Sequence, residues 1–136
     1  MIHHCLFKAT FLFAIALGSL SQMGCKRAVC DPVPLDEFWT AHKEVIPPGA
    51  TICKVGKSGD APRLDIDFAD DPNPFVTIVQ HAESKGFART EQKIDNPDFQ
   101  SMMLGKGKGA DLAIVAVSLS REGGRYHGSF TWEGKQ

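Results

Sequence analysis

The sequence predicts an α+β fold, with two helices on one face of a mostly antiparallel sheet of about five to six strands. Two segments place apolar residues at helical spacing, and several others alternate apolar and polar residues as strands do. Short turns rich in Gly, Asn and Pro separate the last four of these strands, and strands joined by such turns pair antiparallel. The chain of 136 residues has room for one domain of this kind.

Both helices are predicted from apolar stripes bounded by start and stop signals. The first helix ends at Pro47, and its stripe consists of Leu35, Phe38, Trp39, His42 and Ile46. In the second helix Asn73 is the cap, Pro74 is the first residue and Gly86 is the stop. Its stripe consists of Phe75, Ile78, Val79 and Ala82. We expect both stripes to pack against the sheet.

The remaining segments are predicted as strands. They are expected at residues 50–55, 63–68, 87–94, 99–104, 111–120 and 125–132. The fifth contains the run 112–117, which is apolar on both faces and therefore indicates a central strand. The predicted core consists of Phe38, Trp39, Leu64, Ile66, Phe68, Phe75, Ile78, Val79, Phe87, Ile114, Val115, Val117, Phe130 and Trp132.

The charge of the chain argues against one class of partner. Fifteen basic and 16 acidic residues give a formal net charge of −1 at pH 7. Nucleic-acid-binding domains carry a surplus of Lys and Arg, because they neutralise phosphates. The sequence therefore predicts no nucleic-acid partner.

An apolar run near the start of the chain is typical of an export signal. Residues 9–20 are almost entirely apolar, follow Lys8, and lead into small and polar residues. A helix that spans a bilayer needs about 20 apolar residues, so this run is too short for a permanent transmembrane anchor. Cleavage by the general signal peptidase is one possible outcome, because Ser19 and Ser21 form the small-residue pair that it requires.

A second kind of processing is indicated by Gln22-Met23-Gly24-Cys25. This stretch resembles the four-residue box of bacterial lipoprotein precursors, which ends in Cys. Gly24 and Cys25 match that box, whereas Gln22 and Met23 stand where the family prefers Leu and then Ala or Ser. The resemblance implies cleavage before Cys25 and lipid on its sulfur, so that the domain is tethered to a membrane face.

The number of cysteines indicates which of them can form a disulfide. Cleavage by either route removes Cys5 and leaves Cys25, Cys30 and Cys53. If Cys25 carries lipid, as the resemblance implies, Cys30 and Cys53 remain to form a disulfide in an oxidising compartment. The alternative is a disulfide between Cys25 and Cys30, with Cys53 as a buried thiol.

Three local motifs have some features of binding sites, but none is predicted to be one. The triplet Gly56-Lys57-Ser58 resembles the end of a phosphate-binding loop, but Thr51 stands where that loop requires glycine. The glycine- and lysine-rich run 105–109 is expected to be a solvated hairpin tip. Four acidic residues are interpreted as a solvated strand face that leads into a helix cap, not as a calcium site. They are Asp65, Asp67, Asp70 and Asp71.

The histidines do not indicate a catalytic or metal centre either. His42, His81 and His127 lie far apart in the sequence and lack paired metal-ligand spacing. We expect no two of them to share a pocket with a carboxylate. Ser118, Ser120 and Ser129 stand in no nucleophile-elbow context. No catalytic residue, metal ligand or cofactor is therefore predicted.

The sequence favours a non-catalytic envelope lipoprotein. Residues 1–24 are expected to be the signal peptide, 25–34 the lipidated tether and 35–136 a single α+β domain. The domain is expected to face the periplasm or the exterior of a bacterial cell and to bind or scaffold a protein partner in the envelope. The alternative is a freely exported periplasmic domain that binds a small ligand or acts as a small hydrolase.

Overall fold

The computed structural model describes residues 29–68, 72–96 and 98–134. Within them the element order is α1 (Glu37–Ala41), η1 (Lys43–Val45), β1 (Ala50–Ser58), β2 (Ala61–Phe68), α2 (Pro74–Ser84), β3 (Ala88–Asn96), β4 (Phe99–Lys106), η2 (Gly109–Asp111), β5 (Ala113–Glu122) and β6 (Arg125–Trp132). The predicted α+β class is confirmed, with two α-helices and a six-stranded sheet.

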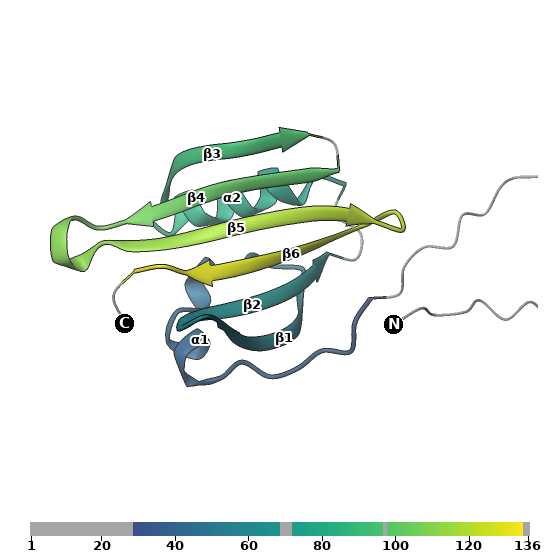
Figure 1. Cartoon of the computed structure of the whole chain (residues 1–136), viewed down its shortest axis with the longest axis horizontal. Coiled ribbons are helices and arrows are strands. Elements are labelled where there is room, and N and C mark those ends of the chain that lie inside the picture. The colour runs from purple at the N-terminus through teal and green to yellow at the C-terminus, as the bar shows by residue number, and fades with distance from the viewer. Residues whose placement is uncertain (1–28, 69–71, 97, 135–136) are drawn as a thin grey trace, which may run out of the picture.

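All neighbouring strands of the sheet pair antiparallel, in the order β1-β2-β6-β5-β4-β3. β1 and β2 form a hairpin, α2 carries the chain to the far edge, and β3 to β6 return as a meander that ends beside β2. Figure 1 shows α2 behind β4 and β5, so that the viewer faces the side of the sheet without this helix. The run 112–117 falls mostly on β5, which is a central strand as predicted.

Both helices begin where a polar side chain can cap them. The Asp36 carboxylate accepts a hydrogen bond from the Trp39 amide at 2.9 Å, and Asn73 does the same for the Val76 amide at 3.5 Å. Pro74 then occupies the first turn of α2, where its missing N–H costs nothing. The apolar sides of α1 and α2 face the sheet, so that Trp39 and Ile78 are fully buried.

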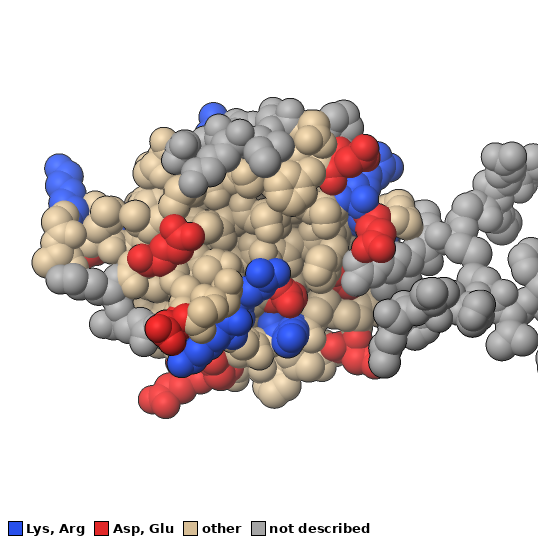
Figure 2. All heavy atoms as spheres, viewed as in Figure 1, with Lys and Arg blue, Asp and Glu red and all other residues tan. Residues whose placement is uncertain are grey.

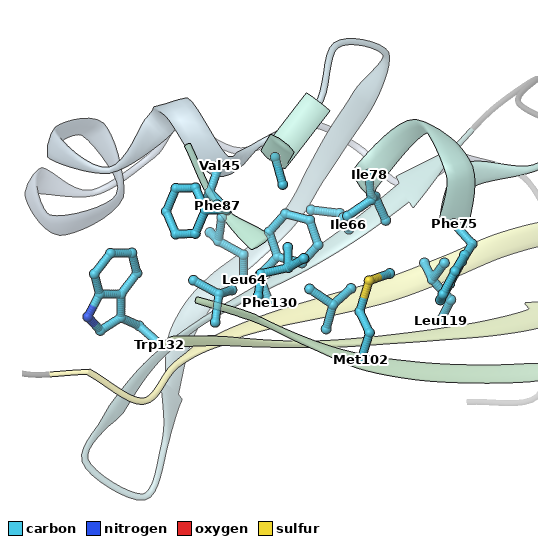
Figure 3. Close-up of a cluster of buried hydrophobic side chains, with 14 of the residues drawn as sticks. Val45, Leu64, Ile66, Phe75, Ile78, Phe87, Met102, Leu119, Phe130 and Trp132 are labelled. Carbon is cyan, nitrogen blue, oxygen red and sulfur yellow. The ribbon is translucent and has the colours of Figure 1, made fainter. Parts of the chain in front are cut away.

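The core lies between the sheet and the helices (Figure 3). The predicted core is largely confirmed, and the structure adds five buried residues: Val45, Ala82, Met102, Leu104 and Leu119. The prediction was wrong for Ile114, which is half-buried on the other side of the sheet, opposite Gly105 of β4. The even-numbered positions of β5 face away from the helices, because successive strand residues point to opposite faces.

The first helix is shorter than its apolar stripe predicted. α1 ends at Ala41, and η1 follows it as a tighter 3₁₀ turn. This turn brings Val45 to zero exposure in the core. The strands also extend further than expected, since β1 continues to Ser58 and β5 to Glu122, with two-residue turns after each.

Candidate functional site

The face of the sheet opposite the helices is organised in three rows of side chains that cross the strands. Strand register defines each row, from β1 through β2, β6 and β5 to β4. The first row is Gly56, Arg63, Thr131, Ala116 and Met103; the second is Lys54, Asp65, Ser129, Ser118 and Ser101; the third is Thr51, Asp67, His127, Ser120 and Phe99. We call this the open face.

Charge is unevenly distributed over the open face. Lys54, Arg63 and Asp65 lie on β1 and β2, where Arg63 Nε is 2.9 Å from Asp65 Oδ1. Figure 2 shows charged side chains over these strands and near the ends of the sheet, with an uncharged area in the middle. The part of the first two rows that lies on β4, β5 and β6 has no charged side chain, and we call it the uncharged patch. It consists of Ser101, Met103, Ala116, Ser118, Ser129 and Thr131.

The uncharged patch is a shallow depression, and five of its six side chains are small. All six residues line a hollow of about 220 Å³, whose rim includes Arg63 and Glu133. Ser118 and Ser129 face each other across β5 and β6, with their hydroxyl oxygens 2.8 Å apart. One of the two hydroxyls donates and the other accepts, so this single hydrogen bond uses only one of the two O–H groups.

The segment that precedes the domain is fastened to the edge strand β1. A disulfide joins Cys30 to Cys53, with a Cα–Cα distance of 5.5 Å, and the Val33 amide donates to the Ile52 carbonyl oxygen at 2.9 Å. The predicted disulfide is thus confirmed, and the alternative pairing of Cys30 with Cys25 is wrong. From Cys30 onward, the segment expected to be a tether is therefore held against the sheet.

A buried carboxylate completes this attachment. Asp67 is only 3% exposed; its Oδ2 accepts from the Cys30 amide at 3.1 Å, and its Oδ1 lies 2.5 Å from Nδ1 of His127. An ionised carboxylate only accepts hydrogen bonds, so the imidazole donates. Asp67 thereby links the incoming chain on one side to β6 on the other.

The interpretation of the acidic cluster as solvated was wrong for Asp67. Strand alternation correctly placed it on the face away from the helices, but the disulfide and His127 cover it there. Asp65 is half-buried beside Arg63, whereas Asp70 and Asp71 lie outside the described residues. No local pattern could have found the pair of Asp67 and His127, because 60 residues separate them.

The third row has the residue types of a hydrolytic triad in register, but its serine is turned away. Ser120 lies directly across from His127, and its hydroxyl donates to the His127 carbonyl oxygen at 3.4 Å. In a working triad the serine hydroxyl donates to the imidazole, which takes the proton as a base. The row as it stands therefore presents an oriented imidazole without an activated nucleophile.

The other two histidines of the described residues, His42 and His81, lie away from this row. His42 stacks on Trp132, with ring centroids 4.2 Å apart, and Nε2 of His81 is 2.8 Å from the Glu44 carbonyl oxygen. His42 and Trp132 line a cleft of about 560 Å³ that also includes Lys106 and Glu44. Lys106, from the predicted hairpin tip, forms an ion pair with Glu44 at 3.1 Å across this cleft.

Replacing Asp67 by asparagine is expected to lower the free energy of unfolding by about 1–3 kcal/mol, because a buried acceptor of two hydrogen bonds loses its charge. Asp65→Asn is the matched control, since it removes a carboxylate from the same strand and face. The ion pair between Asp65 and Arg63 is partly exposed, so it contributes at most about 1 kcal/mol to the free energy of unfolding. Urea unfolding of the oxidised proteins measures both changes, and equal losses would contradict this assignment.

Cys25, the predicted lipidation site, lies outside the described residues. No helix in the described part of the chain is long and apolar enough to cross a membrane. Comparisons with protein-family models, curated proteins and solved structures find no match for this chain.

Proposed function

We propose that the protein is a non-catalytic bacterial envelope lipoprotein, anchored through lipid on Cys25, whose open face binds another envelope protein. The observation that carries this proposal is the attachment at Cys30, only five residues after Cys25. Five residues span at most about 17 Å when fully extended. A domain anchored at Cys25 would therefore stay close to the membrane surface.

The uncharged patch is the surface best suited to a protein partner. Interface centres are depleted in charged residues, and the six residues of this patch carry no charge, while Arg63 and Glu133 also line the hollow. Its small side chains leave a hollow into which the larger side chains of a partner would fit.

The two edges of the sheet are less suited to pairing with another strand. Cys30 and Val33 hold the incoming segment along β1, and two bulges interrupt β3, between Arg89 and Glu91 and between Gln92 and Ile94. Covered edges and bulged edges both hinder the addition of a strand from another chain. The face of the sheet is therefore the favoured docking surface.

The substitution Ala116→Lys tests this surface, because it places a charge in the middle of the uncharged patch. We expect at least a tenfold loss of the partner cross-linked to the full-length protein in membranes of its native host. The matched control is Val76→Lys on α2, a position that is 42% exposed on the helix side. Equal capture by wild type and Ala116→Lys, or an equal loss in the control, would contradict docking on the open face.

A small hydrolase remains the second candidate, and the pair of Asp67 and His127 is the observation that favours it. An imidazole oriented by a buried carboxylate is the basic half of a hydrolytic site. Ester hydrolysis by the purified protein that is lost in both His127→Ala and Ser120→Ala would support this candidate. If either variant retains the esterase activity, the third row of the open face is not the source of that activity.

A further inference from the structure

The disulfide and Asp67 bring together three side chains that can each ligate a metal ion. One ligand atom from each of Cys30, Cys53 and Asp67 lies within 4.8 Å of the others. The carboxylate is almost fully buried and the two cysteines are partly buried. This cluster is distinct from exposed acidic groups, because its members come from three separate segments that the fold brings to one point.

In the reduced state this cluster has the chemistry of a zinc site. Two thiolates and a carboxylate oxygen are three ligands that zinc accepts in tetrahedral geometry, with Zn–S bonds of about 2.3 Å. The two sulfurs of such a site are about 3.8 Å apart, as follows from that bond length and the tetrahedral angle. The Cα atoms of Cys30 and Cys53 are 5.5 Å apart, so rotation of the two side chains can bring the reduced sulfurs to a separation of about 3.8 Å without moving the backbone.

The surroundings of Asp67 are those of an oriented ligand. The Cys30 amide donates to Oδ2, and the His127 ring nitrogen lies at Oδ1. Ligating carboxylates are commonly held by outer hydrogen bonds of this kind, which fix their direction before the metal binds. His127 would act here as a positioning residue for the carboxylate.

We propose that the reduced protein binds one thiophilic divalent cation, such as Zn²⁺, through Cys30, Cys53 and Asp67. A dithiol reductant transfers two electrons and two protons to the disulfide, which gives two protein thiols and the oxidised, cyclic disulfide of the reductant. Binding of Zn²⁺ then releases the two thiol protons and forms two Zn–S bonds. The disulfide and the metal site are alternative states of the same two sulfurs.

Both states keep the incoming chain fastened to the sheet. In the oxidised state a covalent bond joins Cys30 to β1, and in the metal-bound state the cation bridges Cys30, β1 and β2. Metal binding would thus replace the disulfide as the link wherever the thiols are kept reduced. This inference does not depend on lipid at Cys25 or on a partner of the open face.

The test uses the full-length chain in detergent, with Cys5→Ser and Cys25→Ser in every protein so that two thiols remain. After reduction and anaerobic removal of the reductant, Zn²⁺ is titrated against a chromophoric chelator. We expect one Zn²⁺ per chain with a dissociation constant below about 1 µM, which corresponds to about −8 kcal/mol. The oxidised protein is expected to bind at least a hundredfold more weakly.

Asp67→Asn and Asp65→Asn are the matched pair of variants for this site. We expect Asp67→Asn to weaken Zn²⁺ binding at least tenfold and Asp65→Asn to change it less than twofold. Co²⁺ provides a second measurement in the reduced protein that carries Cys5→Ser and Cys25→Ser and keeps both Asp65 and Asp67. The intensity of the thiolate-to-cobalt absorption reports two sulfur ligands, and the visible bands report tetrahedral geometry.

Three results would overturn the proposal. They are the absence of stoichiometric Zn²⁺ binding below about 10 µM by the reduced protein, equal binding by the oxidised protein, and a cobalt spectrum without thiolate absorption. Equal binding by the Asp67→Asn and Asp65→Asn variants would exclude the carboxylate as a ligand. The cobalt measurement requires no aspartate variant, so it tests metal binding by the two cysteines even if Asp67→Asn fails to fold.

Discussion

Cys53→Ser is expected to lower the free energy of unfolding by about 3 kcal/mol, because it removes the link to Cys30. The cysteines are 23 residues apart, and closing a loop of this length restricts the unfolded chain by about that amount. The domain should still fold, since neither cysteine belongs to the hydrophobic core. Urea unfolding in metal-free buffer, followed by tryptophan fluorescence, measures the change.

The wild type under a reducing agent is the natural control for this prediction. It should lose nearly the same free energy of unfolding as Cys53→Ser, and reduction should leave the variant unchanged. A loss below about 1 kcal/mol in both proteins would mean that the disulfide contributes little to the stability of this domain.

Phe130→Ala is expected to cost about 3–5 kcal/mol of unfolding free energy. Phe130 lies on the central strand β6 at zero exposure, and Figure 3 shows its ring among the buried side chains near Leu64 and Ile66. Truncation removes the apolar contacts of the ring and leaves a cavity that the neighbouring strands cannot close.

Phe99→Ala is the matched control for the core substitution. Phe99 begins β4 on the open face and is 37% exposed, so its truncation should cost less than about 1 kcal/mol. Thermal unfolding of both variants provides the comparison. Similar losses in both would contradict the assignment of Phe130 to the centre of the core.

The sequence was sufficient to predict the order of the elements, because local signals mark each of them. Asn73 and Pro74 start α2 as the capping pattern predicts, and the turns between β3, β4, β5 and β6 fix their antiparallel pairing. The length of α1 was not predictable from the same kind of signal. The tighter turn that buries Val45 depends on the tertiary structure around it.

The candidate site was much less accessible from the sequence. Cysteine parity, combined with the lipoprotein resemblance, was enough to predict the link between Cys30 and Cys53. The contact between Asp67 and His127 depends on the pairing of β2 with β6, which follows from the crossover through α2. Alternation placed Asp67 on the correct face but did not reveal that other segments cover it.

Incorporation of labelled palmitate is the most direct test of the proposed lipid anchor at Cys25. Expressed in a bacterium, the wild-type chain should take up the label and be processed, whereas Cys25→Ser should take up none and remain an unprocessed precursor. The domain should fold in both, because Cys25 lies outside the described core. Equal processing of the two proteins, with label in neither, would contradict the account and indicate that the domain is released.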